Sequence, residues 1–138
     1  MIEQLRKATA GSAAWDLRAV ERTVINPGAW AVVGTGIKFN TDEHDTIPPD
    51  WFLLVLSRSG LAVREGIHVL NSPGLIDSDY EGEIKVILMN VGQKKFVVKR
   101  RDRIAQILPM KSHTPPFAGF EHMGEVMREG GLGSTGIN

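Results

Sequence analysis

Short stretches of alternating apolar and polar residues dominate the chain, whereas the spacing typical of an amphipathic helix is scarce. These stretches are rich in β-branched and aromatic residues and recur between turn-forming residues, at intervals typical of sandwiches and barrels. The pattern predicts a mainly β protein. The predicted strands are Trp30–Phe39, Trp51–Leu56, Gly66–Leu70, Glu83–Val91, Lys94–Lys99 and Ile104–Met110, and the predicted connections are Asn40–Pro49, Ser57–Gly60, Asn71–Gly82 and Arg100–Arg103.

Three segments depart from this simple pattern. Gly60–Glu65 is the one stretch where a short helix is plausible, and the segment from Ser112 onward has little pattern. Glu83–Met89 begins with alternation and continues as an apolar run. This run predicts a strand that is half exposed at one end and buried on both faces at the other, in a core or at a subunit interface.

Composition narrows the function classes. A chain of 138 residues without a composition break suits one domain with a substantial core. Sixteen basic residues balance sixteen acidic ones, so no bulk field attracts nucleic acid or a membrane. The absence of cysteine excludes disulfides and thiolate metal sites and suits a reducing compartment. With no apolar signal core and no apolar run long enough to span a bilayer, a soluble cytoplasmic protein is predicted.

The segment from Gly74 to Asn90 joins a carboxylate-rich turn to a strand of period two. Asp77 and Tyr80 lie three residues apart, so a base and an aromatic ring can face one small pocket from a tight bend. This arrangement predicts a substrate hairpin. The alternative is an acidic β-turn on a solvated edge.

Three further places carry candidate chemistry. Arg58, Ser59 and the Gly60 amide follow an apolar strand and could hold a phosphate, although a plain Ser-Gly turn with a solvent-facing arginine is the alternative. Gln106 interrupts an apolar strand and needs a partner, which a ligand or a backbone group can supply. Asp16 interrupts small and apolar residues, for which a buried turn-forming aspartate is the default explanation.

The end of the chain, Arg128–Gly136, combines glycines, hydroxyls and a guanidinium. Exposed glycine N–H groups, the hydroxyls of Ser134 and Thr135 and the two-pronged Arg128 are groups that bind polyphosphates. The spacing differs from the lysine-containing nucleotide loop. A mobile chain terminus is the alternative explanation.

Taken together, these fragments resemble the motifs of the trimeric dUTPase family, the dUTP diphosphatases, in content and in order. The resemblance covers nearly the whole chain, and its third motif, combined with the second and fourth, has little risk of a chance match. The five motifs are AAWDLRA at Ala13–Ala19, SRSGLA at Ser57–Ala62, NSPGLIDSDYEGEIKV at Asn71–Val86, DRIAQI at Asp102–Ile107 and REGGLGSTG at Arg128–Gly136.

The resemblance implies an all-β, jelly-roll-like distorted barrel of the β-clip type that assembles as a homotrimer with active sites at subunit interfaces. Residues 1–111 would form the β domain, and residues 112–138 an arm and tail that close the active site of a neighbouring subunit. The implied reaction is hydrolysis of dUTP to dUMP and diphosphate by water attacking the α-phosphorus. It would keep uracil out of DNA and supply dUMP for dTMP synthesis.

The same resemblance assigns roles to residues of the third motif. Asp77 would orient and deprotonate the attacking water, and the Tyr80 ring would lie against the deoxyribose and exclude a 2′-hydroxyl. The uracil would be read by Asn71 and by the main chain around Gly74, Ile76 and Lys85. Fixed backbone groups must make that choice, because a side-chain amide alone can exchange its donor and acceptor.

The triphosphate would be bound by residues of the other motifs, and Arg58 and Gln106 count with Asp77 as catalytic. Mg²⁺ would be held by triphosphate oxygens and water, with Asp16 as an outer-shell carboxylate and no direct protein ligand. An acidic cluster at Asp42–Asp45 could instead suggest a metal site, although a solvated loop is the better explanation. The remaining triphosphate-binding residues are Ser59, Gly60, Arg128, Gly131, Ser134 and Thr135, while Leu132 would cover the uracil.

Three departures from the family pattern affect this transfer. Ala14 and Arg101 stand where glycine is usual, and at Arg101 a changed turn is expected. Leu132 replaces the phenylalanine that stacks on uracil; it still covers the base but supplies no π stacking, which contributes about 1–3 kcal/mol in other base-binding sites. Two alternatives to a diphosphatase stay open, a related dCTP deaminase and a partner-binding protein that uses its tail or the Asn40–Pro49 loop.

Overall fold

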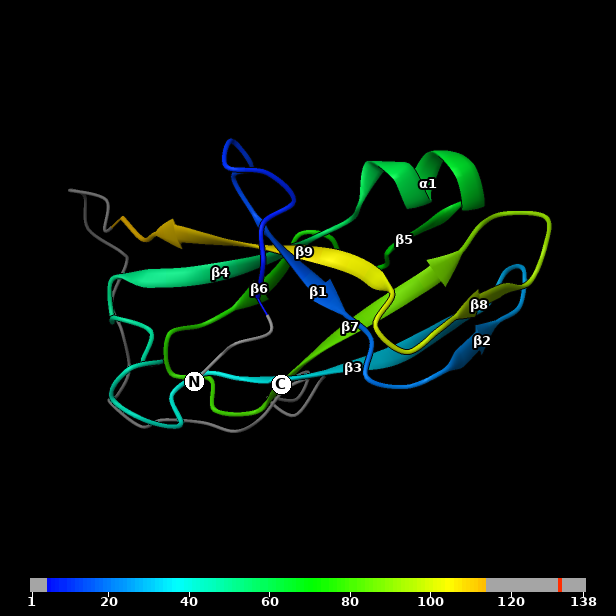
Figure 1. The fold of residues 1–138 in the computed structure, drawn as a ribbon. Helices are drawn as coiled ribbons and strands as arrows, with labels where there is room; N and C mark the ends of the chain where they lie inside the picture. The colour runs from blue at the N-terminus through cyan, green and yellow to red at the C-terminus, as the bar shows by residue number, and fades with distance from the viewer. Residues whose placement is uncertain (1–4, 114–131, 133–138) are drawn as a thin grey trace, which may run out of the picture.

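The computed structural model describes residues 5–113 and 132, and the regular secondary structure of these residues is almost entirely β (Figure 1). The one described helix is α1 (Ser59–Glu65), and within these residues no helix is long and apolar enough to cross a membrane. The strands are β1 (Trp15–Arg18), β2 (Thr23–Ile25), β3 (Trp30–Lys38), β4 (Trp51–Leu56), β5 (Ile67–Val69), β6 (Gly74–Ile76), β7 (Glu83–Asn90), β8 (Phe96–Val98) and β9 (Arg103–Lys111).

The strands form three antiparallel sheets. One has four strands in the order β1-β9-β4-β6, one has three in the order β3-β7-β5, and β2 pairs with β8. The prediction of an all-β fold is confirmed. Within the described residues the sheets do not join into one closed barrel.

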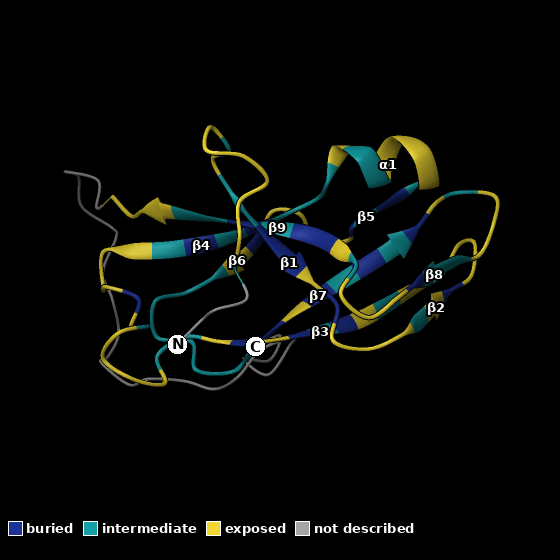
Figure 2. Ribbon diagram, viewed as in Figure 1, coloured by how far each residue is buried: buried dark blue, intermediate teal, exposed yellow. Residues whose placement is uncertain are grey.

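The core lies between the sheets, and buried residues alternate with more exposed ones along the long strands β3 and β7 (Figure 2). On β7, Ile84, Val86 and Leu88 are buried, whereas Ile87 and Met89 are only half-buried. Burying a side chain of this size stabilises a fold by about 1.5–3 kcal/mol. The predicted apolar run is therefore a core strand whose second face stays partly open in a single chain.

The six strands predicted from the sequence and the predicted helix are all present, and their ends agree within two residues. Three strands were missed: β1, β2 and β6. Each is only three or four residues long, too short for its period to stand out, and β1 carries two charged side chains.

The segment from Gly74 to Asn90 differs from its prediction. β6 pairs with β4, while β7 pairs with β3 and β5, so the intervening turn crosses from the four-stranded to the three-stranded sheet. β6 and β7 therefore do not pair with each other as the two strands of a hairpin would. Each strand pairs with a partner far away in sequence instead, and the Tyr80 ring at the crossover packs against the core.

Only Ser57 and Arg58 lie between the end of β4 and helix α1, which stops at Gly66. The Gly66 N–H donates to the Ala62 carbonyl, and its φ of 66° is left-handed. A Cβ at this position would lie 2.6 Å from the Gly92 nitrogen, so both the turn and the close approach require glycine.

Arg101 lies in the turn between β8 and β9 with a φ of 73°, a conformation that glycine adopts easily and arginine rarely. Its N–H donates to the Ala19 carbonyl at 2.7 Å, and its carbonyl accepts a bond from the Arg18 guanidinium at 2.8 Å. Arginine therefore adopts, in this turn, a backbone conformation that favours glycine.

Replacing Arg101 by glycine should increase the free energy of unfolding. The left-handed backbone strain that glycine removes from the folded state is larger than the conformational entropy that it adds to the unfolded chain. The net gain in the free energy of unfolding is about 0.5–1 kcal/mol. Urea unfolding of Arg101→Gly checks this, with Arg100→Gly as the control, because the neighbouring φ is not positive and glycine should destabilise there. A lower midpoint for Arg101→Gly would contradict the strain argument.

Candidate active site

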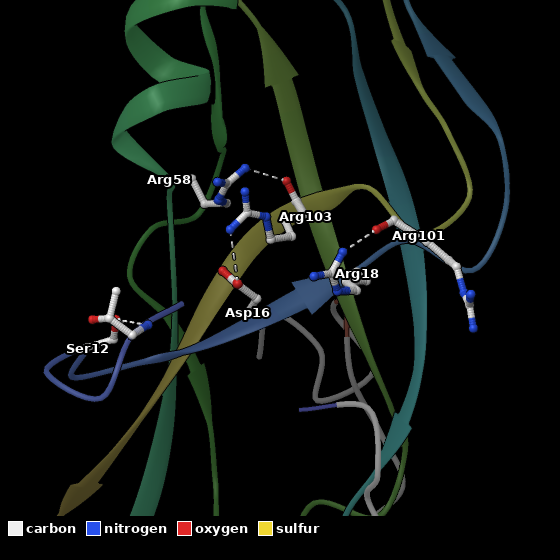
Figure 3. A network of polar contacts seen from close by, with 7 residues as sticks. Ser12, Asp16, Arg18, Arg58, Arg101 and Arg103 are labelled. Carbon is white, nitrogen blue, oxygen red and sulfur yellow. Dashed lines mark hydrogen bonds and ion pairs between the residues drawn. The ribbon is translucent and has the colours of Figure 1, made fainter. Parts of the chain in front are cut away.

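The register of the four-stranded sheet brings three predicted residues together. Gln106 on β9 is opposite Asp16 on β1 and also opposite Leu56 at the end of β4. Directly opposed residues share a face of a sheet, so Asp16 and Gln106 lie side by side. Because β4 continues into Arg58, the sheet places the guanidinium at the same edge (Figure 3).

Arg58 is half-buried rather than solvent-facing. Its Nη1 donates to the main-chain carbonyl of Arg103 at 2.8 Å, as Figure 3 shows. Burial, followed by the positive charge of Arg103, lowers the pKa of the Arg58 guanidinium. Ser59 and Gly60 form the first turn of α1 directly after it. The plain Ser-Gly turn with a solvated arginine is therefore wrong.

Asp16 is buried, with 8% of its surface exposed, but it lies in a strand and not in a turn. Its Oδ2 pairs with Nη1 of Arg103 at 3.5 Å. Two other arginines, Arg18 and Arg64, also act electrostatically on Arg58. The arginines at this edge thus outnumber its one carboxylate, which gives a locally positive site in a chain whose net charge is zero.

Arg103 is the residue that the sequence interpretation missed at this edge. Its side chain holds the Asp16 carboxylate and its carbonyl holds Arg58, so it links both. The available signal was its position within the fourth motif, directly before the predicted strand Ile104–Met110 and three residues before Gln106. Nothing in the sequence identified β1 as the strand beside it.

Gln106 has the backbone partner that the sequence left open. Its Nε2 donates to the Ser57 carbonyl at 3.1 Å, and the Ser57 hydroxyl accepts a bond from the Val69 N–H at 2.8 Å. These bonds tie the end of β4 to β9 and β5. The amide is thereby oriented at the edge where Arg58 emerges.

The second group of predicted residues lies on β6 and the crossover turn. The Tyr80 N–H donates to the Asp77 carbonyl at 3.2 Å, which closes the turn. The Tyr80 hydroxyl donates to the Glu83 carbonyl at 2.9 Å, and burial, followed by the charge of Glu83, raises the pKa of the phenol. The Asn71 amide lies 3.5 Å from where a Cβ of Gly74 would stand, so it flanks the start of β6.

We call the residues around Gln106 and Arg58 the phosphate group and those on β6 and the crossover turn the turn group. Within one chain these two groups do not meet. Ile76 pairs with Leu53 and Gln106 with Leu56, so the two rows are three residues, or about 10 Å, apart along β4. Because β6 and β4 are antiparallel, Asp77, which follows Ile76, lies even farther from Gln106 than Ile76 does. Lys85 lies in the other sheet, exposed and opposite Gly34.

The predicted residues of the tail mostly lie outside the described residues, namely Arg128, Gly131, Ser134 and Thr135. Leu132 is described, with 56% of its surface exposed and a φ of 50°. How the tail relates to the site therefore stays a prediction.

The acidic segment at Asp42–Asp45 is explained by its own loop. The Asp45 carboxylate accepts hydrogen bonds from the N–H groups of Thr41, at 2.9 Å, and Asp42, at 3.0 Å, and from the Thr41 hydroxyl. These hydrogen bonds lower the pKa of the Asp45 carboxyl group, and the bond from the Thr41 hydroxyl has the largest effect. Across the part of the chain that the structure describes, no three His, Cys, Asp or Glu side chains gather to hold a metal ion.

A pocket of about 330 Å³ lies beside this loop and is mostly apolar. None of the predicted site residues lines it, so it is separate from the candidate active site. Its lining residues are Phe39, His44, Asp45, Thr46, Ile47, Pro48, Trp51, Leu53 and Pro109.

A family model described as dUTPase matches residues 2–136. The chain belongs to the dUTPase family. Among curated relatives, the deoxyuridine 5'-triphosphate nucleotidohydrolase of Dictyoglomus turgidum is 47% identical over 94% of this chain and 88% of its own length. The enzyme of the same name from Helicobacter pylori is 44% identical over 94% and 86%. The predicted family, and with it the prediction of a hydrolase, is confirmed.

Solved dUTPase structures share the fold. The dUTPase from Streptococcus mutans superimposes with a TM-score of 0.70 at 28% identity, over 82% of this chain and 88% of that one. The dUTPase of phage phi11 of S. aureus, described with a coordinated structural Mg(II) ion, has a TM-score of 0.72 over 87% and 90%. At 18% identity the phage protein supports the fold alone. The predicted fold class of this dUTPase family member is thus confirmed.

Tyr80 is the single tyrosine of the chain, so its titration can be followed directly. The midpoint of phenolate absorbance in the native protein should lie above 10.0, the ordinary pKa, and return toward that value in denaturant. Because the folded pKa is raised, the associated stability is complete below pH 10 and is lost as the pH rises through the folded pKa. A native midpoint at or below 10.0 would contradict the burial of the ring.

Proposed function

We propose that this protein hydrolyses dUTP to dUMP and diphosphate, with water attacking the α-phosphorus. The observation that carries the proposal is the family match across residues 2–136, whose curated relatives bear the name of that activity. The reaction would remove dUTP as a source of uracil in DNA and supply dUMP for dTMP synthesis. A cytoplasmic location fits such a role.

The arginine-rich edge of the four-stranded sheet would bind the triphosphate. Arg58 is a planar two-pronged donor suited to phosphate oxygens, and the partly buried site strengthens each charge-assisted bond. Gln106, Ser59 and the Gly60 amide would add neutral donors. Further donors would come from the tail residues Arg128, Gly131, Ser134 and Thr135, with Leu132 over the base.

The crossover turn would carry the chemistry. Asp77 would accept the proton of the attacking water, a role typically worth about a hundred- to ten-thousandfold in rate. The Tyr80 ring, fixed by its bond to the Glu83 carbonyl, would crowd the 2′ position of the sugar. Asn71 and the main chain around Gly74, Ile76 and Lys85 would read the uracil.

Magnesium would arrive with the substrate. The described residues offer no cluster of three metal-binding side chains, so triphosphate oxygens and water would supply the ligands. Asp16, buried and paired with Arg103, fits an outer-shell role through water. The metal would offset phosphate charge and fix one reactive geometry.

A homotrimer would complete the site. The turn group and the phosphate group lie about 10 Å or more apart within a chain. As the family resemblance implies, a neighbouring copy would bring one group to the substrate that the other group holds. The half-buried Ile87 and Met89 on β7 pair with Val32 and Trp30, which are 38% and 60% exposed. This open apolar face is suited to contact with another subunit.

The activity is tested with dUTP, dTTP, dCTP and UTP supplied side by side with Mg²⁺. We expect diphosphate release from dUTP alone. The base of dCTP would leave buried groups unpaired, which can discriminate by about ten-thousandfold or more, and dTTP and UTP would be excluded by a clash of the added methyl or hydroxyl group. Asp77→Asn should fold and assemble normally but lose at least about a hundredfold in kcat. Equal rates on all four nucleotides, ammonia release from dCTP, or near-normal turnover by Asp77→Asn would each overturn the proposal.

The composite site is tested by mixing two inactive variants, Asp77→Asn and Arg58→Ala. If each site takes its turn group and its Arg58 from different chains, co-refolded equal mixtures should regain about a quarter of the wild-type rate. Each variant refolded alone is the control, and native mass should be three times the 15.1 kDa of one chain. Persistent inactivity of a mixture shown to contain both chains would place the whole site within one subunit.

A further inference from the structure

Asn40 is an asparagine in the connection between β3 and β4 to which the family motifs assign no role. It is half-buried and has a φ of 59°, in the left-handed region that asparagine tolerates better than most residues. This backbone conformation turns the chain at the end of β3. It also directs the side chain toward the crossover turn that carries Asp77 and Tyr80.

Both hydrogens of the Asn40 amide are donated to that turn. Nδ2 lies 2.9 Å from the Ser78 carbonyl and 2.8 Å from the Tyr80 carbonyl. The Oδ1 accepts a bond from the Ile47 N–H at 2.9 Å. The opposite orientation of the amide would set its oxygen against two carbonyls, so the network determines which atom faces the turn.

These three hydrogen bonds form the Asn40 clamp, and the end of the clamp that lies away from the turn is anchored in the core. Ile47 is buried in the core, and the Asn40 N–H donates to the Asp45 carbonyl at 3.2 Å. Asp45 in turn caps the N–H groups of Thr41 and Asp42. The loop is thus a closed hydrogen-bonded unit attached to the core. Asn40 connects this loop to the crossover turn and so fixes the position of the turn.

We propose that Asn40 is a positioning residue that holds in place both Asp77, the proposed general base, and Tyr80, whose ring would exclude a 2′-hydroxyl. The inference rests on the proposed dUTP hydrolysis, since it is that reaction which gives Asp77 and Tyr80 their tasks. Without Asn40, the Ser78 and Tyr80 carbonyls lose the donor that ties them to the core-anchored loop. The 3.2 Å bond from Tyr80 to the Asp77 carbonyl and the bond from the Tyr80 hydroxyl to Glu83 lie within the turn and its adjoining strand, so they cannot replace this attachment.

Two consequences distinguish this role from general stabilisation. A displaced Asp77 aligns the attacking water poorly, so kcat should fall more than KM rises. A displaced Tyr80 ring crowds the 2′ position less, so the preference for dUTP over UTP in kcat/KM should also fall. A shift of about 1 Å in a positioned group can cost about a hundredfold in rate.

The experiment compares Asn40→Ala and Asn40→Gly with the wild-type chain, using dUTP and UTP. Glycine adopts the left-handed backbone without strain, so Asn40→Gly removes the clamp and preserves the turn of the chain even if Asn40→Ala folds poorly. For both variants that fold, we expect kcat on dUTP to fall by about 10- to 100-fold with KM changed less, and the dUTP preference to fall at least about tenfold.

Asn90 is the matched control. Its amide also donates to two main-chain carbonyls, those of Ile25 at 2.9 Å and Lys94 at 2.8 Å, and its Oδ1 accepts from the Gly92 N–H at 2.9 Å. It lies at the opposite end of β7 from the turn. Asn90→Ala, assayed below its melting temperature, should be less stable but keep the dUTP preference.

The outcomes separate the inference from the function on which it rests. If the wild-type chain hydrolyses dUTP selectively and Asn40→Gly retains both its kcat and its preference, the positioning role is wrong. It is also wrong if the dUTP preference falls equally in Asn90→Ala. If the wild-type chain does not hydrolyse dUTP, the proposed function itself has failed.

Discussion

The pairing of β9 with β1 on one side and β4 on the other is the constraint on which the site depends. One face of this sheet contributes Leu17, Ala105 and Ile107 to the core. The same register sets Asp16 beside Gln106 on the other face and brings the end of β4 to that edge. Hydrophobic burial therefore fixes the polar arrangement, because a slip of one residue would exchange the two faces.

The charge arrangement follows from the same strands. The chain has no net charge, yet several arginines lie close enough to act on one another at the sheet edge, where Asp16 pairs with Arg103. Arg58 and Arg103 are held by a main-chain carbonyl and by Asp16, so like charges are kept close before any ligand is present. Such preorganised charge binds an anion without the cost of first gathering the side chains.

Much of the fold could be predicted from the sequence because the long strands alternate clearly. Strand β4 was predicted with its observed ends, Trp51 and Leu56. β1 and β6 could not be predicted, because they are too short to show an alternation of apolar and polar residues. β1 has four residues, two of them charged, and β6 has three residues, the first of them glycine. For the same reason, the sequence predicts neither the pairing of β6 with β4 nor the crossing of the following turn to the other sheet.

The crossover turn has a consequence for how the protein folds. The strands on either side of it pair with β4 and β3, which lie far upstream in the chain, so local contacts alone do not specify the turn. Long-range pairings of this kind form slowly, because loop-closure entropy is lost before the contacts are gained. The candidate catalytic turn is therefore complete only after both sheets have formed, and partly folded chains should lack a nucleotide site.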